Sequence, residues 1–268
     1  MDASLLSGSG LESATPGLIA LLMVTGLAAG FIDAVVGGGG LLQLPVTLMI
    51  PGLSPVQALA TNKMGSVFGT ATSAVTFYRR VRPDLRTALP MAAVAALAAG
   101  GGAAVAAALP ESVFTPIIVL ALIAVLVFTV ARPSMGQLTE LRHAGAHHYA
   151  RAVALGALIG FYDGVMGPGT GSFLIIALVS VLGYSFLEAS AKAKIVNLAT
   201  NLGALAVFAA HGSVLWGLGL VLGLSNMTGG YLGARTAVAL GSSFIRVVFF
   251  VVVTALIVKL GWDVVSGL

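Results

Sequence analysis

Long uncharged runs recur along this sequence, and they constrain its fold more than any other feature. A helix needs about 20 consecutive apolar residues to cross the hydrocarbon core of a bilayer. Runs without Asp, Glu, Lys or Arg cover residues 87–109, 112–131 and 212–234. Only 8% of the residues are charged, against about 25% in a typical soluble domain. This pattern excludes an ordinary soluble globule.

Further apolar stretches carry one to three charged residues each, at 16–36, 55–78, 151–166, 186–210 and 244–261. Two other pieces, 41–50 and 172–182, are too short to span a bilayer alone. We therefore predict an all-α polytopic membrane protein with about ten membrane segments, eight full and two short. The lipid bilayer is accordingly an expected partner.

The rest of the composition excludes several functional classes. Cysteine is absent, which rules out disulfides, thiolate metal sites and cysteine nucleophiles. The net charge of +4 is spread too thinly for a nucleic-acid-binding face. We expect no catalytic residues, cofactor or metal site, and we place His143, His147 and His148 in a solvated loop. An intramembrane enzyme remains the rival from another class.

The chain contains an internal repeat. Residues 26–33 (GLAAGFID) match 156–163 (GALIGFYD), and a glycine cluster follows each at the same distance. After one residue of slippage, 58–67 align with 189–198, which places Lys63 opposite Lys194. We divide the chain into an N-terminal segment, a first membrane repeat, a linker and a second membrane repeat, at 1–15, 16–131, 132–150 and 151–268.

Basic residues indicate how the two repeats are oriented, because short cytoplasmic loops are enriched in Lys and Arg. An arginine cluster follows the stretch at 55–78, whereas the equivalent turn at 211–213 has no Lys or Arg. We predict two inverted repeats, with the arginine cluster and the 132–150 linker cytoplasmic and both termini extracytoplasmic. Parallel repeats are the alternative. The cluster comprises Arg79, Arg80, Arg82 and Arg86.

Glycine-rich breaks interrupt membrane segments at matching positions of the two halves, GGGG at 37–40 and GPGTG at 167–171. Each glycine costs a helix about 1 kcal/mol relative to alanine, and proline removes a backbone donor. A helix that restarts after such a break directs its N-terminal amides into the surrounding cavity and favours an anion. Matching breaks point to a transporter's binding site. Close helix packing is the alternative, and we assign it to Gly26/Gly30, Gly156/Gly160 and Gly219/Gly223.

A polar stripe lies on the helix that follows each break, at spacings of three and four residues that share one helix face. Such a stripe should face the protein interior, because an ionisable group at the bilayer centre costs about 2.5–3.5 kcal/mol. Lys63 is the stronger candidate for function, since Lys194 can also extend to a nearby cytoplasmic end. The stripe consists of Lys63, Ser66 and Thr70 in the first half and Lys194, Asn197 and Asn201 in the second.

Asp33 and Asp163 each precede a break. Three roles are open to them: an ion pair with a lysine, a cap for the following backbone, or a proton carrier. We favour a structural role.

The motifs GFIDAVVGGGG (30–40), ATNK (60–63) and GFYDGVMGPGTG (160–171) resemble those of the sulfite exporter TauE/SafE family of membrane permeases. The similarity extends from about residue 17 to 259. The resemblance implies a carrier in the bacterial inner membrane for small sulfur-containing anions such as sulfite, sulfoacetate or other organosulfonates. The halves are not identical, because Ala193 stands where Asn62 does and Lys192 where Thr61 does.

We expect a small anionic substrate to bind where the two breaks approach each other, and transport to proceed by movement of one half or bundle against the other. A passive anion channel and a proton- or cation-linked carrier that uses Asp33 and Asp163 are the alternatives. The predicted binding residues are Gly38, Gly39, Gly40, Leu41, Gln43, Asn62, Lys63, Ser66, Thr70, Pro168, Gly169, Thr170, Gly171, Ser172, Lys194, Asn197 and Asn201.

Overall fold

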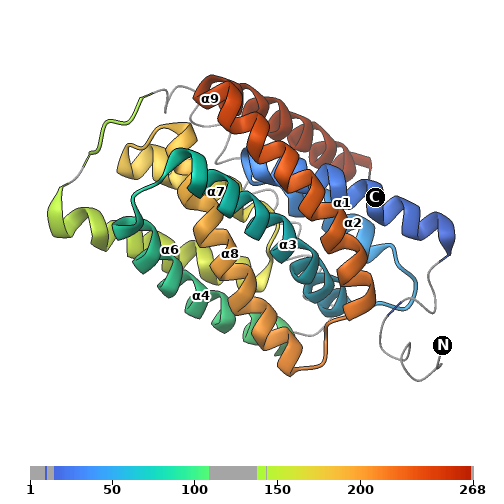
Figure 1. Ribbon diagram of the computed structural model, residues 1–268. Helices are drawn as coiled ribbons and strands as arrows, with labels where there is room; N and C mark the ends of the chain where they lie inside the picture. Colours follow the sequence, from blue (N-terminus) through green and yellow to red (C-terminus); the bar gives the residue numbers. More distant parts are fainter. Residues whose placement is uncertain (1–9, 11–14, 109–137, 143, 267–268) are drawn as a thin grey trace.

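The structure is a computed structural model that describes residues 10, 15–108, 138–142 and 144–266. Helices make up its first half, and none of the described residues forms a strand. The order is α1 (Pro16–Val36), α2 (Gly39–Leu48), α3 (Pro55–Val81) and α4 (Leu85–Ala108), as Figure 1 shows. The helix expected at 112–131, most of the 1–15 segment and residues 132–137 and 143 of the linker lie outside the described residues.

The second half repeats this order with α6 (Gly145–Val165), α7 (Thr170–Ala177), the π-helical turn η2 (Leu178–Leu182), α8 (Phe186–Ala210) and α9 (Trp216–Ser266). The segments expected at 212–234 and 244–261 are the two helical parts of α9, which meet at Gly241, where a φ of 72° and a ψ of −167° interrupt the helix. The start of α6 differs from the sequence prediction. Helix α6 begins at Gly145 rather than at residue 151, because its first turn is anchored by the buried side chain of His148.

Three helices begin at side-chain caps that the sequence supplies. The Ser54 hydroxyl accepts a hydrogen bond from the Gln57 amide (3.3 Å), while the Gln57 side chain accepts one from the Ser54 amide (3.0 Å). This reciprocal capping box satisfies two backbone donors at the start of α3. Thr15 and Ser185 cap α1 and α8 more simply, because their hydroxyl groups accept hydrogen bonds from the Leu18 and Glu188 amides. The caps explain why these helices begin where the apolar stretches begin.

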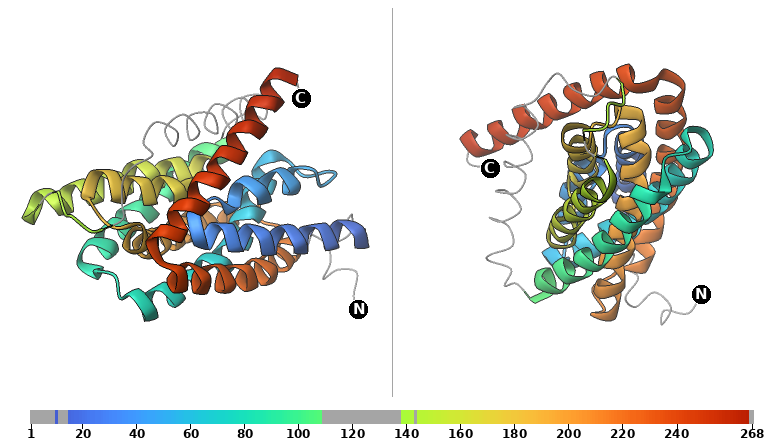
Figure 2. Two further views of the ribbon diagram at one scale, coloured as in Figure 1. Left: turned by 90° about the horizontal axis from the view of Figure 1, so that it is seen from above. Right: turned by 90° about the vertical axis from the view of Figure 1, so that its left-hand side faces the viewer.

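The long helices form two bundles, and each bundle takes one helix from the other half of the chain (Figures 1 and 2). Bundle one contains α1 and α3 together with α9, which packs on both of them. Bundle two contains α6 and α8 together with α4, which packs on both of them. Helices α3 and α8 join the bundles, and the short helices α2 and α7 pack on their own halves.

Small residues bring helices of opposite halves into close contact. A Cβ atom placed on Gly30 of α1 would lie 2.2 Å from the carbonyl oxygen of Asn226 in α9. A Cβ atom on Gly160 of α6 would lie 2.4 Å from the carbonyl oxygen of Ala95 in α4. These are backbone contacts that a larger residue would block, so the Gly26/Gly30 and Gly156/Gly160 faces serve helix packing.

Large apolar side chains on the outside of the helices fit a lipid environment. Val24, Leu97 and Leu158 are 69%, 79% and 70% exposed. Four helices of the described chain are long and apolar enough to span a membrane, namely Pro16–Val36, Leu85–Ala108, Phe186–Ala210 and Trp216–Phe249. Exposed apolar surface on this scale marks contact with lipid or another protein rather than with water.

Candidate functional site

The two glycine-rich breaks touch each other in the interior. Helix α1 ends at Gly37, which has a φ of 80°, and α7 begins after Gly169, which has a φ of 84°. The Ser172 hydroxyl donates to the carbonyl oxygen of Val36 (2.7 Å), and its amide donates to that of Gly37 (3.2 Å). A Cβ atom on Gly171 would lie 2.5 Å from Gly37 Cα. Glycine at both positions therefore permits direct backbone contact between the halves.

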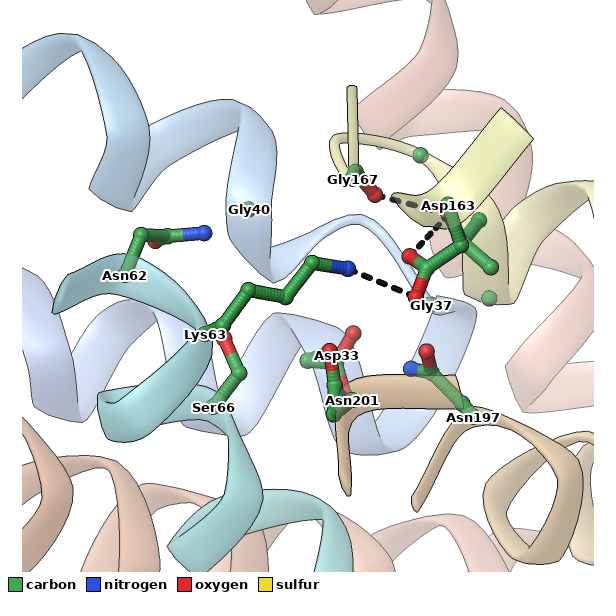
Figure 3. A pocket seen from close by; sticks show the side chains of 13 residues that line it. Asp33, Gly37, Gly40, Asn62, Lys63, Ser66, Asp163, Gly167, Asn197 and Asn201 are labelled. Carbon is green, nitrogen blue, oxygen red and sulfur yellow. Dashed lines mark hydrogen bonds and ion pairs between the residues drawn. The ribbon is translucent and has the colours of Figure 1, made fainter. Parts of the chain in front are cut away.

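Two ion pairs lie beside this contact, and each joins a lysine of one half to an aspartate of the other. The Nζ atom of Lys63 lies 2.6 Å from Asp163 Oδ2 (Figure 3). The Nζ atom of Lys194 lies 2.9 Å from Asp33 Oδ2 and also donates to the Asp33 carbonyl oxygen. Both pairs therefore cross between bundle one and bundle two.

The Lys63–Asp163 pair is almost completely withdrawn from solvent, because its side chains are 2% and 1% exposed. In the second pair Lys194 is 0% exposed, whereas the side chain of Asp33 is 15% exposed. Removing one partner of such a pair typically costs about 3–5 kcal/mol, because the other charge stays buried without a counter-ion. Asp163 Oδ1 accepts a hydrogen bond from the Thr170 hydroxyl (2.6 Å), whereas Lys63 is the only partner of Oδ2 in the described part of the chain.

A small cavity separates the break regions from the polar stripes, and Figure 3 shows Lys63 and Asp163 facing each other in it. Its volume is about 20 Å³, which is room for about one water molecule. Pockets for small ligands typically measure about 300–1,000 Å³. The cavity is therefore too small in this structure to hold a ligand of that size. The lining residues are Asp33, Gly37, Gly40, Asn62, Lys63, Ser66, Asp163, Gly167, Gly169, Thr170, Gly171, Asn197 and Asn201.

Eleven of these thirteen lining residues were site candidates from the sequence, and Gly37 and Gly167 complete the set. Other candidates lie just outside the lining. The Thr70 hydroxyl donates to the Ser66 carbonyl oxygen (2.8 Å), and Lys194 is held by Asp33. The candidates that do not line the cavity are Gly38, Gly39, Leu41, Gln43, Thr70, Pro168, Ser172 and Lys194.

The backbone amides of the breaks are less available than the sequence suggested. We expected free amides throughout 38–41 and 168–172, but several donate within the protein. The Leu41 amide donates to the Gly38 carbonyl oxygen (3.1 Å), and the Thr170 amide donates to that of Gly167 (3.4 Å). The Ser172 amide donates to the Gly37 carbonyl oxygen. The contact between the breaks therefore consumes main-chain donors in this state.

Two polar residues that support the site were not among the sequence candidates. Asn226 of α9 donates to Gln43 Oε1 (2.6 Å), which ties α9 to α2. The Tyr162 hydroxyl donates to the carbonyl oxygen of Pro168 (2.6 Å) and so holds the second break. Asn226 could have been found as the only amide side chain in an otherwise apolar run at 212–234. Tyr162 adjoins Asp163 in the repeated motif.

A second polar cluster lies beside the arginine-rich turn between α3 and α4. His148 is buried rather than solvated as expected, and its Nε2 atom lies 2.9 Å from the Tyr184 hydroxyl and 3.3 Å from that of Thr87. His147 is exposed on α6, and His143 lies outside the described residues. Nearby, Lys192 Nζ lies 4.1 Å from the centre of the Tyr184 ring.

Asp84 anchors this cluster from the turn that precedes α4. Its carboxylate accepts hydrogen bonds from the Thr87 hydroxyl (2.7 Å) and the Arg86 amide (2.9 Å). Partial burial by itself raises the pKa of Asp84, but these hydrogen bonds outweigh it and hold the pKa below its ordinary value. The carboxylate thus stays ionised at neutral pH.

An all-helical body with an apolar exterior and a buried cluster of charges at matching helix breaks is the architecture of a membrane transporter. The sulfite exporter TauE/SafE family model matches residues 22–260. The chain belongs to this family, whose members are membrane transporters rather than enzymes.

Named relatives agree with this assignment. The chain is 38% identical to the probable membrane transporter protein ORF9 of Sinorhizobium sp over 91% of its length and 92% of that protein. It is 32% identical to the probable membrane transporter protein YfcA of Escherichia coli K12 over 93% of its length and 91% of that protein. It is 30% identical to a probable membrane transporter protein of Haemophilus influenzae over 91% of its length and 96% of that protein. No solved structure matches the chain.

Proposed function

We propose that this protein carries small sulfur-containing anions, such as sulfite, sulfoacetate or other organosulfonates, across the bacterial inner membrane by alternating access. The observation that carries the proposal is the buried Lys63–Asp163 ion pair at the meeting point of the two breaks. A cation in this place offers a counter-charge to an anion within the bilayer, where ionisable groups generally mark a substrate pathway.

The groups around Lys63 suit the oxygen atoms of a sulfite or sulfonate. Ser66, Asn62, Asn197 and Asn201 line the cavity with hydroxyl and amide donors. Each oxygen of such an anion can accept more than one hydrogen bond, so neutral donors can replace its hydration shell beside a single ammonium group. Because the family is named for sulfite export, sulfite is the first substrate to test.

Alternating access requires that the closed cavity open to one side of the membrane at a time. Both ion pairs span the interface between bundle one and bundle two, so the bundles are the natural moving bodies. The equivalence of their contacts supports an inverted repeat, because α4 packs on α6 and α8 as α9 packs on α1 and α3.

The orientation follows from the basic residues. Arg79 and Arg80 lie in the last turn of α3, Arg82 follows the helix, and Arg86 lies in the first turn of α4. We assign this end to the cytoplasm by the positive-inside rule and both termini to the extracytoplasmic side.

The function is tested by reconstituting the protein in liposomes and measuring counterflow of labelled sulfite or sulfoacetate. Counterflow, in which unlabelled anion inside drives uptake of labelled anion, is expected of a carrier and not of a passive channel. Lys63→Ala and Gly39→Leu should lose more than about 90% of the initial rate, because an ion pair of this burial contributes several kcal/mol. Lys192→Ala removes an equally buried lysine outside the cavity. It serves as the matched control and should keep most of the initial rate of counterflow.

Two outcomes would redirect the assignment. Undiminished flux in both Lys63→Ala and Gly39→Leu removes the proposed site. Flux of a cation that is abolished by Asp33→Asn and Asp163→Asn but insensitive to Lys63→Ala identifies a cation carrier instead.

A further inference from the structure

The two buried ion pairs are not equivalent, and the difference identifies which one can exchange. Lys194 is held twice by Asp33, through the carboxylate and through the main-chain oxygen. Lys63 Nζ contacts Asp163 Oδ2 alone among the described residues. Both members of the Lys63–Asp163 pair line the cavity, whereas of the second pair Asp33 lines it and the cation Lys194 does not. The Lys63–Asp163 pair is therefore the one that a substrate can reach.

An anion that binds Lys63 must take the place of the Asp163 carboxylate. The cavity of about 20 Å³ leaves no room for the anion and an undisturbed ion pair together. The carboxylate already occupies the position that a substrate oxygen would take, 2.6 Å from Nζ. The Asp163 carboxylate thus competes with the substrate for Lys63.

Among the described residues, the displaced carboxylate has no other cation to receive it. Asp163 is 1% exposed, and its Oδ2 atom has no partner besides Lys63 in the described part of the chain. Of the titratable groups around it, Asp33 is also an acid, Lys194 is engaged by Asp33, and the Tyr162 hydroxyl donates to Pro168. An unpaired charge in this place is strongly disfavoured, and a proton removes it.

We propose that Asp163 takes up one proton when a substrate anion replaces it at Lys63, and releases that proton when the anion leaves. The inference rests on the proposed function and adds the coupling ion: each anion moves together with one proton. The proton comes from the same aqueous side as the anion and binds Asp163 Oδ2, and no covalent bond of the substrate changes. Asp33 keeps its ion pair with Lys194, so the ratio is one proton per anion rather than two.

Binding and protonation must then be linked reciprocally, so lower pH must strengthen anion binding. The probe is sulfoacetate, which remains a dianion between about pH 6 and pH 8 because carboxylic acids titrate near pH 4. Thermal-shift titrations of the purified protein measure its affinity. The affinity of the wild type should fall about tenfold per pH unit over this range, as expected when binding requires one proton. For Asp163→Asn it should be independent of pH.

Transport provides the second readout. Liposomes whose membrane potential is clamped at zero should accumulate sulfoacetate about tenfold when the outside is one pH unit more acidic, since a tenfold ratio corresponds to one proton. Asp163→Asn should lose this accumulation. Asp84→Asn, which removes an acid outside the cavity, is the matched control and should keep the pH dependence of binding.

The outcomes separate the two proposals. Counterflow without accumulation, or an affinity that does not change with pH in the wild type, overturns proton coupling and leaves the carrier intact. Absence of counterflow with both sulfite and sulfoacetate overturns the carrier itself. Persistence of the pH effect in Asp163→Asn refutes the assignment to Asp163. If Asp163→Asn elutes as aggregate in size-exclusion chromatography, Asp163→Ser replaces it in the binding series.

Discussion

Removing Lys63 alone should destabilise the protein more than removing Lys63 and Asp163 together. The perturbation is Lys63→Met, which keeps the length of the side chain and removes its charge. Both partners are 2% exposed or less, and Asp163 Oδ2 has no substitute partner in the described part of the chain. The single substitution should therefore cost about 3–5 kcal/mol.

The double variant Lys63→Met/Asp163→Asn should recover most of this loss. Replacing both members of a buried ion pair is often neutral or stabilising by about 1–4 kcal/mol, because neither charge is then left unpaired. The Asn side-chain oxygen can still accept the hydrogen bond from Thr170. The coupling free energy from the complete cycle should accordingly exceed about 2 kcal/mol.

Thermal unfolding in detergent, followed by tryptophan fluorescence, measures the four members of the cycle. For a chain of this size 1 kcal/mol shifts Tm by about 2–4 °C, so Lys63→Met should lower Tm by about 6–20 °C. Lys192→Met is the matched control, because Lys192 is equally buried but contacts the ring of Tyr184. The reasoning is wrong if the double variant unfolds at the temperature of Lys63→Met or lower.

Three further predictions concern the breaks, a helix cap and the turn before α4. Gly171→Ala should cost about 1–3 kcal/mol in unfolding free energy, because its Cβ would lie 2.5 Å from Gly37 Cα. The control Gly101→Ala places its Cβ where no atom lies within 4 Å, so it should stabilise α4 by about 1 kcal/mol. Equal thermal shifts in the two variants would contradict the close contact. Ser54→Ala removes the α3 capping box and should cost about 1 kcal/mol by the same assay, and an unchanged Tm would show that the cap contributes nothing. Because the pKa of Asp84 is depressed in the folded state, its stabilisation is fully present above about pH 4 and is lost progressively as the pH falls toward the lowered pKa. The Tm difference between wild type and Asp84→Asn should therefore shrink steadily as the pH falls below about 4, and a difference that stays constant would contradict the assignment.

Much of the helical architecture could be predicted because local signals mark the helix ends. The stretches at 16–36 and 186–210 coincide with α1 and α8, since Thr15 and Ser185 cap the first turns of apolar runs. The start of α6 was missed because histidines and a tyrosine were interpreted as a solvated linker. In the structure His148 packs against Tyr184 and Thr87, which are far away in the sequence.

The candidate site shows the same division between local and long-range information. The repeat placed Lys63 opposite Lys194 and Asp33 opposite Asp163, and the cavity brings both aspartates and Lys63 together. The sequence could not show that each lysine pairs with the aspartate of the opposite half, because that choice depends on how the bundles assemble. The contact between Gly37 and Gly171, which occupies amides expected to face the substrate, is long-range information as well.

The exchange of α4 and α9 between the bundles also has a consequence for biosynthesis. Chains emerge from the ribosome N-terminus first, so α4 enters the membrane before α6 and α8 exist. Helix α4 must therefore remain in contact with lipid until α6 and α8 have been synthesised. The first half likewise cannot complete bundle one before α9 has been synthesised. Two fragments made by cutting the gene within the 132–150 segment should therefore be unstable when produced singly and should assemble when produced in the same cell.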